Sequence, residues 1–220
     1  MRKVGIMPIK LNNERLPGKN IRMLGNKPLI QYALEEILTS KTLDEMYVYC
    51  SSNKVVPYLI EGVRFLKRPE ELDLPTSNFT QIFTQFMNTI DADLYVYTHA
   101  TAPFVSAKSI RACVDAVVSG NSDSAFTATE IRDYLWQDGK PMNFDATNLP
   151  RSQDLKPIYR ESSGVYVFRK EVFQLYHRRV GVNPYIHILN AREAIDINTA
   201  EDFRMAEIML EQSGQGFMSF

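Results

Sequence analysis

The chain has 220 residues, 45% of them hydrophobic and 23% charged, which is ordinary for one globular domain with a sizeable core. Its formal net charge of -1 excludes a broad electrostatic attraction to nucleic acid or to an anionic membrane. The apolar run after Lys3 is too short for a signal peptide, and no stretch approaches the roughly 18 apolar residues of a membrane span. Cys50 and Cys113 lack zinc-type spacing, so we expect two reduced thiols in a cytoplasmic protein.

Short apolar runs alternate with helical patterns through the first half of the chain. Strands are expected at residues 4–7, 46–50, 63–66, 94–97 and 124–127, and helices at 28–38, 79–90 and 106–118. Pro28 suits the first turn of its helix, where a missing N–H costs nothing. This alternation predicts an open, mainly parallel α/β sheet with right-handed connections. Such sheets bind ligands beyond the carboxyl ends of their strands.

The alternation stops after Ile131. Residues 134–157 are rich in polar and turn residues and contain Trp136, the only tryptophan, so we expect an excursion from the sheet. A strand at 164–168 and helices at 170–176 and 200–210 follow, and we expect the tail from Ser213 to be frayed. We therefore expect a single domain over residues 1–220, with an inserted segment at about 132–160.

The loop at residues 8–20 is the first candidate for chemistry, because it directly follows the first expected strand. It places three cations, Lys10, Arg15 and Lys19, within ten positions. A triphosphate needs fixed cations and converging backbone N–H donors, and the Asn and Gly residues of the loop help the chain to turn. The spacing is neither a Walker motif nor a Rossmann fingerprint, so a solvated surface loop with scattered charges is the alternative.

This loop also resembles the opening signature of the acylneuraminate cytidylyltransferase family, P-A-R-G-G-S-K-x-I-P-x-K-N. Pro8, Pro17, Lys19 and Asn20 match that signature by position. Further segments resemble family motifs in the same order: 25–30, 68–72 with Thr76 and Ser77, Thr101 with Pro103, 151–155 with 159–161, and 195–199 with 201–203. Six ordered matches across nearly the whole chain make a chance likeness an unconvincing explanation.

The resemblance implies a three-layer α/β/α Rossmann-like nucleotidyltransferase fold with an inserted dimerisation segment. It implies transfer of CMP from CTP to the anomeric hydroxyl of a sialic-acid-like 2-keto sugar acid, with release of pyrophosphate. The expected partners are CTP, the sugar acid and a second copy of the chain in a homodimer, without nucleic acid or membrane. An octulosonate acceptor, another nucleotide and a catalytically silent nucleotide-binding homologue remain as alternatives.

The resemblance also assigns residues to the site. Nucleotide binding is expected of Ile9, Lys10, Asn13, Arg15, Lys19, Asn20, Arg68 and Ser77, and acceptor binding of His99, Thr101, Arg151, Gln153, Tyr159 and Arg160. Lys10, Lys19 and Asp196 are the expected catalytic residues. Residues 151–160 could instead pack against a second subunit, and His99 could act as a general base or as a hydrogen-bonding contact to the acceptor.

A magnesium ion is the expected cofactor, because CTP carries about four negative charges and Mg²⁺ prefers carboxylate, phosphate and water oxygens. The family pattern places its metal ligands at Asp196 and Asn198, which an extended segment would present on one side. Asn198 supplies only a neutral carbonyl, so binding should be weaker than with two aspartates. The alternative is that both residues merely cap the final helix.

Several positions of the expected site depart from the family pattern. Lys10 replaces an arginine and loses its bidentate fork, while Leu11 and Asn12 replace two glycines. The other departures are His99 for glutamine, Ser162 and Ser163 for Asn-Gly, and Asn198 for aspartate. They are concentrated where the acceptor and the metal would bind, so the identity of the sugar acid is the least determined part of the assignment.

Overall fold

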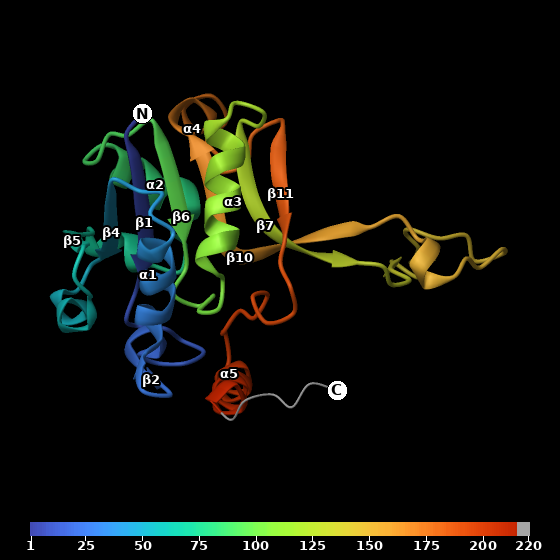
Figure 1. The fold of residues 1–220 in the computed structure, drawn as a ribbon, viewed down its shortest axis with the longest axis horizontal. Helices are drawn as coiled ribbons and strands as arrows, with labels where there is room; N and C mark the ends of the chain where they lie inside the picture. Colours follow the sequence, from blue (N-terminus) through green and yellow to red (C-terminus); the bar gives the residue numbers. More distant parts are fainter. Residues whose placement is uncertain (215–220) are drawn as a thin grey trace.

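The computed structural model describes residues 1–214, except the side chains of 213 and 214, and its centre is a seven-stranded sheet (Figure 1). The strands are β1 (Lys3–Ile9), β4 (Glu45–Cys50), β5 (Val63–Lys67), β6 (Leu94–Thr98), β7 (Ser124–Ile131), β10 (Ile158–Arg169) and β11 (Pro184–Ile188). Their order across the sheet is β11-β7-β10-β6-β1-β4-β5. β10 runs antiparallel to both neighbours and the other pairs are parallel, so the expectation of a mainly parallel sheet is confirmed.

Helices cover both faces of this sheet. α1 (Leu29–Thr39) and α3 (Ala107–Val118) pack on one face, and α2 (Phe79–Met87) and α4 (Lys170–Tyr176) on the other. Within β1, Met7 joins the first apolar cluster while Ile6 joins the second, because successive strand residues point to opposite faces. The expected three-layer α/β/α architecture is therefore confirmed.

The segment between β7 and β10 is an arm that projects from the body of the molecule (Figure 1). It carries a small hairpin of β8 (Trp136–Gln137) and β9 (Lys140–Pro141), followed by the short 3₁₀ helix η4 (Ser152–Asp154). No α-helix crosses the sheet between β7 and β10, so the chain returns beside β7 in the opposite direction. This return explains why β10 is the antiparallel strand of the sheet.

Strand β11 is an element that the sequence pattern did not predict. It pairs only with β7 and begins at Pro184, which an edge strand tolerates because no ladder N–H is lost inside the sheet. None of its side chains is fully buried, so it lacks the continuous buried apolar run that marked the central strands.

Short elements and the last helix close the carboxyl end of the sheet. They are η1 (Lys19–Ile21), β2 (Met23–Leu24), β3 (Lys27–Pro28), η2 (Asn53–Tyr58), η3 (Glu70–Asp73) and α5 (Ala200–Gly214). Leu16 and Ile197 meet in a third apolar cluster with Phe203 of α5, so this cluster fixes the 8–20 loop against the 195–199 segment. The helices within residues 1–214 include none that is long and apolar enough to cross a membrane. The expected fraying from Ser213 concerns residues that mostly lie outside the described range.

Candidate active site

The site lies where the chain changes direction across the sheet. From β1 the chain builds outward through β4 to β5, and then returns to place β6 on the other side of β1. Open α/β sheets bind ligands at the carboxyl ends of strands beside such a switch point. The 8–20 loop leaves β1 at this place, and a cavity of about 340 Å³ opens beside it. Its lining residues are Lys10, Asn13, Glu14, Arg15, Leu16, Lys19, Pro75 and Asn198.

The loop reaches this cavity without backbone strain at its substituted glycine positions. The non-glycine residues with positive φ within residues 1–214 are Lys41, Asp138 and His177, so Leu11 takes an ordinary conformation. The left-handed position falls instead at Gly18, with φ of 66°, immediately before η1. The amide of Asn20 then donates to the carbonyl oxygen of Lys10 at 3.0 Å and closes the loop.

Three segments are tied together beside the cavity. The buried ammonium of Lys19 donates to the carbonyl oxygen of Ile197 at 2.6 Å, and Arg15 donates to Oδ1 of Asn198 at 3.0 Å. The backbone N–H of Ile197 donates to the carbonyl oxygen of Thr101 at 2.8 Å. Burial lowers the pKa of Lys19 below its ordinary value, and the carboxylate of Asp196 partly opposes this. The loops after β1 and β6 thus share the 195–199 segment as their anchor.

Asp196 has one carboxylate oxygen satisfied and one free. Its Oδ2 accepts hydrogen bonds from Ser163 Oγ at 2.9 Å and from the amide of Asn198 at 2.7 Å. Its Oδ1 is buried without a hydrogen-bond partner in the described residues. A buried carboxylate oxygen left unpaired costs free energy, so this atom is suited to a cation or a ligand proton. Residues 1–214 contain no group of three or more His, Cys, Asp or Glu side chains placed to hold a metal ion, so protein side chains of these types would not complete a metal site here without other ligands.

The cap of α5 is made by other residues. The carboxylate of Asp202 accepts the backbone N–H groups of Asn198 and Thr199, each at 2.8 Å, while Thr199 Oγ1 accepts from the N–H of Asp202. The side chains of Asp196 and Asn198 are therefore not needed for capping. Capping of α5 therefore does not account for the free oxygen of Asp196.

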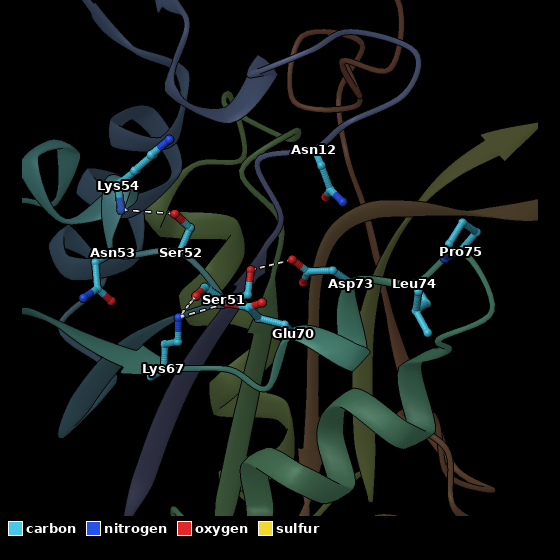
Figure 2. A pocket seen from close by; sticks show the side chains of 10 residues that line it. All are labelled: Asn12, Ser51, Ser52, Asn53, Lys54, Lys67, Glu70, Asp73, Leu74 and Pro75. Carbon is cyan, nitrogen blue, oxygen red and sulfur yellow. Dashed lines mark hydrogen bonds and ion pairs between the residues drawn. The ribbon is translucent and has the colours of Figure 1, made fainter.

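Arg68 supports the end of β1 from the neighbouring strands. Its buried guanidinium donates through Nη2 to the carbonyl oxygen of Ile9 at 2.8 Å and pairs with Asp73. Asp73 also accepts from Ser51, as Figure 2 shows, so β4 and η3 hold Arg68 in place. Nε of Arg68 is buried without a partner in the described part of the chain, and one donor thus stays available for a ligand.

A second hollow of about 570 Å³ lies beside this support (Figure 2). Asn12 of the 8–20 loop and Pro75 border it, and Pro75 also lines the cavity of Lys10 and Lys19. Ser77 lies nearby in sequence, but its hydroxyl donates to the carbonyl oxygen of Glu71 at 3.1 Å. The expected nucleotide residues are thus distributed along one edge of the sheet, with Ser77 engaged by its own loop.

His99 follows β6 and is held in one tautomer. Its Nδ1 lies 2.7 Å from the carbonyl oxygen of Ser163, which can only accept, so Nδ1 carries the proton and Nε2 is left as an acceptor. Burial, together with the nearby cation of Arg179, lowers the pKa of His99 to about 4. A neutral imidazole with so low a pKa retains a proton poorly near neutrality. Of the two roles considered, a hydrogen-bonding contact to the acceptor fits this environment better.

The pKa of His99 predicts a specific dependence of stability on pH. The unfolded chain takes up a proton at this residue as the pH falls below about 6.5, whereas the folded chain does so only near pH 4. This linkage should lower the free energy of unfolding by up to about 3 kcal/mol between those values, with no contribution above them. His99→Gln should remove this component in urea unfolding measured from pH 4 to 7.5, whereas His177→Asn at an exposed position should retain it. An identical pH profile for wild type and His99→Gln would contradict the prediction.

The arm residues lie elsewhere. Arg151 is paired with Asp154 at 2.7 Å, and Gln153 and Arg160 are exposed. Tyr159 is 42% exposed, where β10 enters the arm. Figure 1 shows the arm pointing away from the body, so one chain does not bring Arg151 and Gln153 to its own cavity. The structure does bring Lys10, Arg15, Lys19 and Asn198 to one cavity, and Asp196 is bonded to Asn198 beside it.

Sequence reasoning did not assign three further residues at this edge. Asp73 orients Arg68, Ser163 links Asp196 to His99, and Arg179 reaches the surroundings of His99 from the segment after α4. The double serine at 162–163 was visible as a departure from the family pattern, which was the available signal for Ser163. Asp73 and Arg179 had no such signal, because only tertiary packing brings them to the site.

The fold and the cationic loop at its switch point define a nucleotide-binding α/β enzyme of the nucleotidyltransferase class. A family model described as Cytidylyltransferase matches residues 4–212. The chain therefore belongs to the cytidylyltransferase family.

Known proteins similar to this chain have related names. The pseudaminic acid cytidylyltransferase of Campylobacter jejuni is 23% identical, over 95% of this chain and 96% of its own length. The CMP-N,N'-diacetyllegionaminic acid synthase of Legionella pneumophila is 24% identical, over 96% of this chain and 97% of its own length. A Helicobacter pylori protein, named as a pseudaminic acid cytidylyltransferase and a UDP-2,4-diacetamido-2,4,6-trideoxy-beta-L-altropyranose hydrolase, is 23% identical over 96% of this chain. The chain spans only 43% of that protein's length.

Solved structures agree on the fold. A CMP:2-keto-3-deoxy-manno-octonic acid synthetase complexed with CTP superposes with a TM-score of 0.72 at 16% sequence identity, covering 97% of this chain and 100% of that one. A 4-diphosphocytidyl-2C-methyl-D-erythritol synthase from Anaerococcus prevotii gives 0.67 at 13% identity, covering 96% of each chain. These likenesses support the nucleotidyltransferase fold that the sequence predicted.

Proposed function

We propose that this chain transfers CMP from CTP to the anomeric hydroxyl of a sialic-acid-like 2-keto sugar acid and releases pyrophosphate. The observation that carries the proposal is the convergence of Lys10, Arg15 and Lys19 on one cavity with Asn198, whose amide is bonded to the carboxylate of Asp196. Several cations around one cavity suit a triphosphate, and a carboxylate beside them suits its counterion. The names of the relatives support a cytidylyl donor and a sugar-acid acceptor.

In the proposed reaction the hydroxyl oxygen attacks the α-phosphorus of CTP, a new P–O bond forms, and the bond between the α-phosphorus and the bridging oxygen breaks. The hydroxyl gives up its proton to water, and pyrophosphate leaves. Lys10, Arg15 and Lys19 hold the phosphates and offset the charge that develops on the departing pyrophosphate. Asn20 keeps the loop closed, and Arg68 holds the end of β1 with one N–H free for the nucleotide. Fixing both reactants in line supplies much of the rate gain.

A magnesium ion fits this site through Asp196 Oδ1, with phosphate and water oxygens completing its ligands. Such an ion would neutralise phosphate charge and polarise the α-phosphate. Ser163 and Asn198 both donate to the other carboxylate oxygen and so orient Asp196. The carbonyl oxygen of Asn198 accepts from Arg15, so Asn198 acts through this network rather than as a strong ligand.

A second copy of the chain is the proposed partner of the arm. The arm exposes Trp136, Met142 and Leu149 at 58%, 54% and 62%, and a second subunit would cover them. Docking of two arms would cover these residues and could bring Arg151 and Gln153 to the partner's acceptor site. Light scattering should give twice the chain mass, and Trp136→Arg should shift it to the monomer. We keep the expectation of a cytoplasmic location for this enzyme.

Pyrophosphate release tests the proposed reaction. Purified protein is incubated with CTP, Mg²⁺ and a panel of sialic, legionaminic, pseudaminic and octulosonic acids. Release with one nonulosonic acid, absent with ATP or GTP, is the expected result; release only with octulosonic acid would reassign the acceptor. A rise in melting temperature with CTP but no release with any acid would favour a silent nucleotide-binding homologue.

A further inference from the structure

Arg179 lies beside the proposed acceptor site, although nothing in the sequence pattern marked it. It belongs to the segment between α4 and β11, and its guanidinium stacks on the ring of Tyr166 at 3.6 Å. The rings of Phe79 and Tyr97 lie at 5.4 and 6.0 Å from the same group. His99 contacts both tyrosines, with centroid distances of 5.1 Å to Tyr97 and 6.3 Å to Tyr166. Arg179 and His99 therefore share one aromatic surrounding.

The guanidinium of Arg179 is held in place by its neighbours, but only some of its N–H groups have hydrogen-bond partners in the described residues. Nη2 donates to the hydroxyl of Tyr166 at 2.9 Å and lies 3.6 Å from the carboxylate of Glu161. The hydroxyl of Tyr166 itself donates to Glu161 at 2.8 Å. Within residues 1–214 the structure assigns no hydrogen bond to Nε or Nη1 of Arg179, and the side chain is 28% exposed. A stacked, oriented guanidinium with free N–H groups can bind a ligand at little further entropic cost.

Two charged groups approach His99 through different residues. Asp196 is connected to it through Ser163, whose hydroxyl contacts the carboxylate at 2.9 Å and whose carbonyl contacts the imidazole at 2.7 Å. Arg179 is connected to it through Tyr97 and Tyr166. The reacting hydroxyl of the acceptor has to lie near Asp196 and Lys19, where the α-phosphate would be. A sugar acid that extends from there past His99 presents its distal substituents to Arg179.

We propose that Arg179 is a specificity-determining residue, whose free N–H groups bind an oxygen of the acceptor remote from the anomeric carbon. This inference rests on the proposed function and names the residue that distinguishes one acceptor from another. A guanidinium only donates, so it selects a hydroxyl or an acylamino carbonyl oxygen and disfavours an N–H or methyl group at the same place. Glu161 and Tyr166 fix its orientation, and they position Arg179 rather than contact the sugar.

The test compares Arg179→Met with Arg178→Met. Arg178 is the matched control, because this exposed neighbour stacks on Tyr176 at 4.9 Å and donates to the carbonyl oxygen of Gly181. The dissociation constant of each acid of the panel is measured by calorimetry, and pyrophosphate release is measured separately. Arg179→Met should raise the dissociation constant and KM of the preferred acid by about 10- to 100-fold and leave KM for CTP unchanged. Arg178→Met should match the wild type.

If the methionine variant does not fold, Arg179→Lys replaces it, because lysine keeps the charge and an aliphatic stem that packs. It should give a smaller rise in the dissociation constant and KM, because only the planar guanidinium is lost. Equal affinity for the preferred acid in wild type, Arg179→Met and Arg179→Lys would overturn the inference while leaving the proposed reaction in place. Binding of an acid by the wild type without pyrophosphate release would overturn the reaction, and the affinities would still decide the role of Arg179. Failure of the wild type to bind any acid would overturn both.

Discussion

Asp196→Ala is expected to lower kcat/KM for pyrophosphate release by about 10³-fold, which corresponds to the several kcal/mol that a metal-assisted step supplies. The reason is the Oδ1 atom of Asp196, which is buried without a hydrogen-bond partner in the described chain, while its Oδ2 is joined to Asn198 at the cavity. Activity is measured with CTP over a range of Mg²⁺ concentrations. Glu201→Gln is the control, because Glu201 is exposed in the first turn of α5. Unchanged turnover in Asp196→Ala would contradict the metal role.

Asn198→Asp tests the same metal site by adding a carboxylate instead of removing one. The amide of Asn198 now donates to Asp196, and its carbonyl accepts from Arg15. An aspartate would keep the contact with Arg15 and add a second negative oxygen beside Asp196. We expect the half-saturating Mg²⁺ concentration to fall, because a second carboxylate strengthens an oxygen site. The same substitution should weaken folding in the absence of metal, since two carboxylates would then repel each other.

The central fold was predictable because its signals are local. β1, β4 and β6 are buried on both faces, so each is a continuous apolar run, and α1 and α3 carry apolar residues at helical spacing. β11 was missed because none of its side chains is fully buried at the edge of the sheet and its pairing with β7 is set by tertiary structure. The backbone path of the 8–20 loop could not be predicted from the sequence pattern either, since Gly18 rather than residue 11 takes the left-handed conformation.

The parts of the candidate site that lie within continuous stretches of sequence were predictable. The cationic loop and the 195–199 segment were found from spacing and resemblance, and the structure joins them through Lys19 and Arg15. Whether Asp196 and Asn198 cap α5 could not be decided from sequence, because both lie just before the helix with suitable residue types, and only the structure shows that Asp202 does so instead. Arg179 comes from a segment without any motif, and only its stacking on Tyr166 brings it near His99.

Lys19 and Lys10 should separate two roles of the phosphate loop. Lys19→Met is expected to reduce kcat/KM by about 10²- to 10³-fold through the loss of a fixed cation. It should also lower the free energy of unfolding by about 1–3 kcal/mol, because the carbonyl oxygen of Ile197 then loses its buried donor. Lys10→Met should lose activity to a similar degree with little change in stability, since the structure assigns its ammonium no hydrogen bond within residues 1–214.

Steady-state kinetics and urea unfolding of the two variants measure these effects independently. The contrast follows from geometry, because Lys19 joins the 8–20 loop to the anchor that also holds Asp196 and Thr101, whereas Lys10 contributes only its charge to the cavity. Equal losses of stability in both variants would mean that the bond from Lys19 to Ile197 does not hold the loop. A stable, fully active Lys19→Met variant would remove Lys19 from the proposed phosphate site and leave Lys10 and Arg15 as its cations.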